Sequence, residues 1–145
     1  MAATTLPAAS YEPRGADATR EKLLQATHEL LVERAGAEPS LSQVCERAGV
    51  QTGMVRYCFG GKTQMLEALV ERLRDAVQAD LDRLAATDLD PEEKLRRNVK
   101  GMVANFDRFP YARHFTEQVR AGTSHGQQIA SIFGQIGRAS CRERV

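Results

Sequence analysis

Apolar residues recur every three or four positions along most of the chain, and this spacing constrains the fold more than any other feature. Such a period gathers the apolar side chains on one face of an α-helix. Glycine, proline and acidic residues interrupt the pattern at short intervals, and no run alternates apolar and polar residues as a strand would. The sequence therefore predicts an all-α protein.

The first half of the chain predicts two short helices between two longer ones. The first helix should begin at an N-cap, Asp17, and stop at Gly36, and the second should begin with a capping box of Ser40 and Gln43. The expected bounds are about 17–36, 40–49, 51–58 and 63–87. Leu23, Ala26, Thr27, Leu30 and Leu31 should form the buried face of the first helix, and Leu41, Val44, Cys45 and Ala48 that of the second.

The second half predicts three more helices. Asp90 suits an N-cap and Pro91 the first helical position, so a helix should start there. It should end before Pro110, because the residue that precedes a proline resists helical geometry. The expected bounds are 91–109, 111–122 and from 124 onward.

Two short helices joined through a glycine and braced by longer ones form the helix-turn-helix pattern. The second short helix is too brief to be stable alone, so its neighbours must hold it and its outer face is free to enter a groove. That face carries Gln51, Thr52, Gly53, Met54, Arg56 and Tyr57, and Lys62 follows at the start of the long helix. Small, hydrogen-bonding and cationic side chains suit contacts with base edges and phosphates. The competing interpretation is a plain helical bundle with a solvated polar face.

Residues 17–75 resemble the DNA-binding domain of the TetR family of transcriptional regulators. The resemblance rests on TREKLLQATHELLVERAG and LSQVCERAGVQTGMVRYCFGGK, including ERAGV at 46–50, Gly53 and the F-x-x-K motif at 59–62, and on the long apolar-striped helix that follows. It implies that Val55 and Phe59 are core residues. It also implies that the following residues lie at or near DNA: Ser42, Thr52, Gly53, Met54, Arg56, Tyr57 and Lys62.

Cys58 is the clearest departure from this family pattern, which usually has an aromatic hydroxyl or a histidine at that position. A thiol is shorter and only a weak donor, so we expect a weaker phosphate contact. The residues leave open whether Cys58 is simply packed or responds to oxidation.

The resemblance further implies that the fourth and later helices bind a small apolar or amphipathic effector. The helices that pair subunits into a homodimer are expected beyond Gln135, and the dimer would read a palindromic operator in double-stranded DNA. The expected pocket residues are Met102, Phe106, Tyr111, His114 and Phe115. Ordinary core packing is the competing interpretation at each of them.

The expected organisation has four parts. They are a disordered N-terminal arm at 1–16, a helix-turn-helix domain at 17–62 with its motif at about 40–59, a partial helical ligand-binding and dimerisation domain at 63–135, and a non-native tail at 136–145. The tail, IGRASCRERV, breaks the apolar period and matches the translation of a common sequencing adapter. A natural basic tail is the alternative.

Other classes of function find little support in the residues. The net charge of +1 is no argument for nucleic acid, so the DNA hypothesis depends on the local pattern. The cysteines are too far apart for a zinc site, the histidines lack partners at catalytic spacing, and G-x-x-x-x-G-K is absent. We therefore expect no enzyme, cofactor or metal. With no secretory signal and no membrane-spanning run, we expect a cytoplasmic protein. A helical protein-interaction module without DNA binding remains the alternative.

Overall fold

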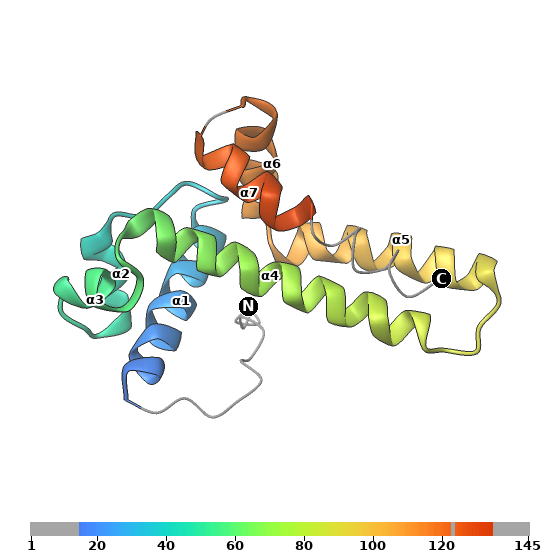
Figure 1. The fold of residues 1–145 in the computed structure, drawn as a ribbon, viewed down its shortest axis with the longest axis horizontal. Helices are drawn as coiled ribbons and strands as arrows, with labels where there is room; N and C mark the ends of the chain where they lie inside the picture. Colours follow the sequence, from blue (N-terminus) through green and yellow to red (C-terminus); the bar gives the residue numbers. More distant parts are fainter. Residues whose placement is uncertain (1–14, 123, 135–145) are drawn as a thin grey trace. The chain divides into compact units, whose positions relative to one another are not determined.

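The computed structural model describes residues 15–122 and 124–134, and within them the chain is helical with no strand (Figure 1). The helices are α1 (Ala16–Glu33), α2 (Leu41–Ala48), α3 (Gly53–Phe59), α4 (Lys62–Ala85), α5 (Pro91–Arg108), α6 (Tyr111–Arg120) and α7 (Ser124–Gly134). The all-α prediction is confirmed. The tail expected at 136–145 and nearly all of the arm expected at 1–16 lie outside the described residues.

The chain forms two compact units, and the boundary between them falls inside α4, between Val70 and Glu71. The first unit holds α1, α2, α3 and the start of α4, and the second holds the rest of α4 with α5, α6 and α7. The sequence placed its domain boundary at 62/63, where α4 begins.

Helix α1 is the centre of the first unit, and both α2 and α3 pack against it. Its buried residues are Leu23, Leu24, Ala26, Thr27, His28, Leu30 and Leu31, which include the whole face expected from the sequence. The Thr27 hydroxyl donates to the carbonyl of Leu23 at 2.7 Å, and it also meets the sulfur of Met65 on α4 at 3.6 Å. The buried hydroxyl is thus satisfied within the helix, as burial of a polar group requires.

The ends of α2 follow the sequence prediction, whereas the ends of α1 do not. The Ser40 side chain accepts from the Gln43 N–H, the Gln43 side chain accepts from the Ser40 N–H, and Gly49 ends α2 in the left-handed conformation. The assignment of Asp17 as an N-cap is wrong, because Gly15 holds that position and Asp17 lies in the first turn. An acidic residue in the first turn, two positions after the cap, still complements the helix dipole.

The last turn of α1 also closes earlier than expected. The helix ends at Glu33, three residues before Gly36, and the Gly36 N–H then donates to the carbonyl of Leu31 at 2.8 Å with a φ of 96°. Glycine reaches this positive φ at little cost, so Gly36 completes the helix end rather than terminating it directly.

In the second unit, the later part of α4 and α5 lie side by side and antiparallel (Figure 1). Asp90 caps α5 by accepting from the N–H groups of Glu92 and Glu93, and Pro91 occupies the first turn, as predicted. Helices α6 and α7 pack against each other. No residue of α5 is buried, so this helix contributes nothing to a closed core.

None of the helices in the described ranges combines the length and the apolar character needed to span a membrane.

Candidate nucleic-acid interface

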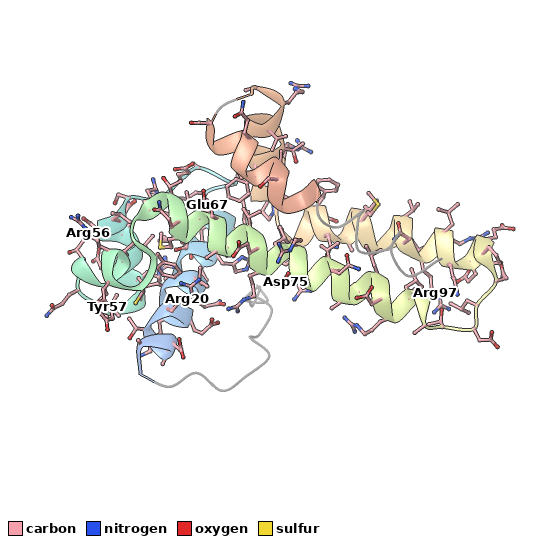
Figure 2. The ribbon with its side chains drawn as sticks, viewed as in Figure 1. Arg20, Arg56, Tyr57, Glu67, Asp75 and Arg97 are labelled. Carbon is pink, nitrogen blue, oxygen red and sulfur yellow. The ribbon has the colours of Figure 1, made fainter. Side chains whose placement is uncertain are left out.

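Helix α3 is anchored on one side and open on the other. Val55 is buried, whereas Arg56 and Tyr57 are exposed, Tyr57 at 75% (Figure 2). The exposed members of the expected DNA-facing set are Ser42, Gln51, Thr52, Gly53, Arg56 and Tyr57. Met54 is half-buried and therefore straddles the two sides. The structure thus brings together an outward strip of polar and cationic side chains on α3 and the turn before it.

Gly53, the first residue of α3, has no packing reason to be glycine. A Cβ placed there would meet no atom of the protein within 4 Å, and the residue adopts no positive φ that would demand glycine. The absence of a side chain leaves the backbone at the start of α3 open to close approach by another molecule.

Helix α2 is tied to α1 by a bidentate ion pair. The guanidinium of Arg47 donates to both carboxylate oxygens of Glu33, at 2.8 and 2.9 Å, and it lies 3.4 Å from Glu29. The hydrogen bond from Arg47 holds the pKa of Glu33 below its ordinary value, and the same pair raises the pKa of Arg47. Arg47 is therefore turned toward α1.

Lys62, the first residue of α4, is a cation that the sequence predicts at a phosphate. Its ammonium lies 3.0 Å from the carboxylate of Glu38, and both side chains are about one-third exposed. A phosphate that bound Lys62 would compete with this carboxylate for the same ammonium. Glu38 was not singled out by the sequence pattern, because it lies far from Lys62 along the chain.

The C-terminal end of α3 meets an arginine from α1. A guanidinium nitrogen of Arg20 donates to the carbonyl of Cys58 at 3.0 Å, and its central carbon lies 4.3 Å from the centre of the Phe59 ring. Cys58 and Phe59 are both half-buried, so Phe59 is less enclosed than the family resemblance implies. Sequence reasoning missed Arg20, and no local signal links it to residues 38 positions away.

The second unit contains an apolar cavity of about 230 Å³. It is lined by Leu73, Val77, Met102, Asn105, Phe106, Phe109, Ala112 and Thr116. Two of the expected pocket residues, Met102 and Phe106, line it.

Two other expected pocket residues, Tyr111 and Phe115, lie elsewhere. Tyr111 and Phe115 are buried, with their rings edge to face at 5.7 Å, and neither lines this cavity. Burial also raises the pKa of Tyr111. The edge of one ring meets the face of the other, and both are buried, so the two rings behave as core residues and fit the packing interpretation. The side chain of His114 lies outside the description.

Within residues 15–122 and 124–134, no group of three or more His, Cys, Asp or Glu side chains is arranged to hold a metal ion.

Comparison with known proteins relates the chain to helix-turn-helix regulators, although no family model matches it. The HTH-type transcriptional regulator BetI of Paraburkholderia phytofirmans is 39% identical over 89 residues, which is 61% of this chain and 44% of the relative. BetI of Paraburkholderia xenovorans is 41% identical over 90 residues, and BetI of Yersinia pestis is 35% identical over 92 residues, with the same coverage. The chain therefore spans less than half the length of these curated relatives.

Proposed function

We propose that this chain is part of a sequence-specific, DNA-binding transcriptional regulator of the TetR type. The observation that carries the proposal is the outward face of α3, where Arg56 and Tyr57 are exposed beside a glycine that the fold itself does not require. Its similarity to named helix-turn-helix regulators supports the same conclusion.

In this proposal α3 enters the major groove, and its exposed residues read base edges. The residues assigned to the interface are Ser42, Gln51, Thr52, Gly53, Met54, Arg56, Tyr57 and Lys62. An α-helix fits the major groove, and an arginine can pair with guanine through two hydrogen bonds. Lys62 would bind a phosphate after leaving Glu38, and exchanging one anionic partner for another limits the gain from that contact.

We further propose that the complete protein acts as a homodimer on a palindromic operator and responds to a small effector. Two-fold symmetry allows two recognition helices to read two half-sites. The apolar cavity of the second unit is the candidate effector site. Its lining has few polar groups, Asn105 and Thr116 among them, which favours an apolar or amphipathic ligand.

A gel-shift experiment tests the function. Protein expressed from the complete gene is titrated against a duplex taken from the region upstream of that gene, with a scrambled duplex of equal length and composition as the control. We expect the upstream duplex to be retarded at a protein concentration at least about a thousandfold lower, a typical lower limit for specific over non-specific binding. Equal retardation of both duplexes would contradict sequence-specific regulation. Failure to retard either would favour a helical interaction module.

A further inference from the structure

Helix α3 cannot determine its own position, because it is too short and too little buried. It has seven residues, and Val55 is the only one of them that is fully enclosed. Isolated helices of this length are unstable in water. The direction in which its exposed side chains point must therefore be set by contacts from outside the helix.

The contacts at the C-terminal end of α3 come from Arg20 on α1. The last carbonyls of a helix lack partners within the helix, and the negative end of the helix dipole lies there. Arg20 supplies a donor to one such carbonyl, that of Cys58 at 3.0 Å, and places its positive charge at that end. Its guanidinium also lies over the ring of Phe59, with 4.3 Å from its central carbon to the ring centre. One side chain thus holds two consecutive residues through two different interactions.

Fixing these two residues fixes the rotation of α3 about its axis. Cys58 and Phe59 directly follow Arg56 and Tyr57, whose side chains are exposed (Figure 2). A rotation of α3 that moved Cys58 and Phe59 would therefore turn Arg56 and Tyr57 away from their present direction. The planar guanidinium resists such a rotation, because it must satisfy the carbonyl and the ring together. Its half-buried side chain is held on α1, the helix against which α3 packs.

We propose that Arg20 is a positioning residue of the nucleic-acid interface: it sets the rotation of α3, and so the aim of Arg56 and Tyr57, without itself binding DNA. This role rests on the proposed DNA-binding function. The rival role for an arginine near such a surface is a direct phosphate contact, and the two roles differ in what they predict.

Amide hydrogen exchange of the full chain tests the anchoring without DNA. The Gly60 N–H, which donates to the carbonyl of Arg56 at 2.9 Å, reports on the end of α3. In Arg20→Ala we expect its exchange to accelerate roughly tenfold, as for the loss of one hydrogen bond from a charged donor. The Val50 N–H at the end of α2 should not change. Lys22→Ala, which removes an exposed cation from the same helix, should leave Gly60 unchanged. Unaltered exchange of Gly60 in Arg20→Ala would overturn the proposal.

Fluorescence anisotropy with the upstream duplex, over a range of salt concentrations, tests the role in binding. Arg20→Ala should weaken binding roughly tenfold while the slope of log K against log salt stays as in the wild type. A lost phosphate contact would instead reduce the slope by about 0.9. Arg20→Lys should resemble Arg20→Ala, because an ammonium keeps the charge but cannot donate to the carbonyl and lie flat on the ring together.

Two outcomes would contradict Arg20 as a positioning residue. These are a reduced salt slope in Arg20→Ala and full recovery of binding in Arg20→Lys. Wild-type protein from the complete gene that bound neither the upstream nor the scrambled duplex, with exchange at Gly60 still dependent on Arg20, would instead overturn the proposed function.

Discussion

Helix α1 of the first unit and helix α5 of the second unit use their apolar residues in opposite ways. In the first unit, α1 buries seven residues, and the one large apolar side chain with high exposure among the described residues is Tyr57. In the second unit, α5 buries none and exposes a stripe made of Leu95, Val99, Met102, Val103 and Phe106, each more than half exposed.

The difference shows that α1 is enclosed in a core, whereas α5 is not. The leucines of α1, Leu23, Leu24, Leu30 and Leu31, are all buried, whereas each large apolar side chain of the stripe on α5 is more than half exposed. An exposed apolar patch of this extent usually marks a surface that meets another molecule or segment. Tyr57 differs from the stripe because it stands alone beside the exposed, cationic Arg56.

The largest contrast between the two units should appear in their stability. Leu31→Ala on α1 empties a fully buried position, and we expect it to lower the free energy of unfolding by about 2–5 kcal/mol. The matched change Leu95→Ala on α5 truncates a side chain that is 65% exposed, and we expect a change within about 0.5 kcal/mol. Urea titration followed by circular dichroism measures both. Equal effects would remove the contrast between the units.

The next effect concerns DNA binding. Arg56→Ala on α3 should weaken binding to the upstream duplex by about 1–3 kcal/mol if its guanidinium reads a base. Arg113→Ala removes the same charge from an exposed position on α6, and we expect little change. Anisotropy titrations of both variants, with the fold checked by circular dichroism, test the assignment. A loss of the same size in both variants would mean that only overall charge matters.

A smaller effect is expected at the start of α2. Ser40→Ala removes the acceptor for the Gln43 N–H, a contact of 3.3 Å, and should destabilise the first unit by about 1 kcal/mol. Ser40→Asp is the control, because a carboxylate accepts the same hydrogen bond and should retain most of the stability. Thermal unfolding of the three proteins measures the difference. An alanine variant as stable as the wild type would mean that α1 alone holds α2 in place.

The smallest effect is a pH dependence from Glu33, whose folded-state pKa lies below the ordinary value of 4.5 because of its hydrogen bond with Arg47. A depressed carboxyl pKa contributes stability above the unfolded-state value, and this contribution is lost as pH falls through the folded-state value. The melting temperature of the wild type should therefore fall toward that of Arg47→Ala between about pH 5 and pH 3. A difference between the two proteins that stayed constant over this range would show that the pair is not coupled to protonation.

Much of the fold could be predicted from residues close together in the sequence. The capping box of Ser40 and Gln43 and the Asp90–Pro91 start of α5 were both predicted, because each feature depends on residues within one helical turn. The buried face of α1 followed from its apolar period. The N-cap at Gly15 was missed, which shows the limit of local prediction. An aspartate is favourable both at the cap position and in the first turn, so Asp17 alone does not mark where the helix begins.

The sequence by itself determined an all-α chain with a short helix whose outer residues are polar and cationic, because helical period and turn chemistry are local properties. Only the tertiary structure decided how that helix is held. Arg20 reaches Cys58 across 38 positions, Arg47 reaches Glu33 across 14, and Lys62 pairs with Glu38. It also decided that Tyr111 and Phe115 are enclosed while Phe106 is half exposed. Period and propensity assign a side chain to a face of its own helix, but the partner of that face depends on how helices distant in the sequence pack.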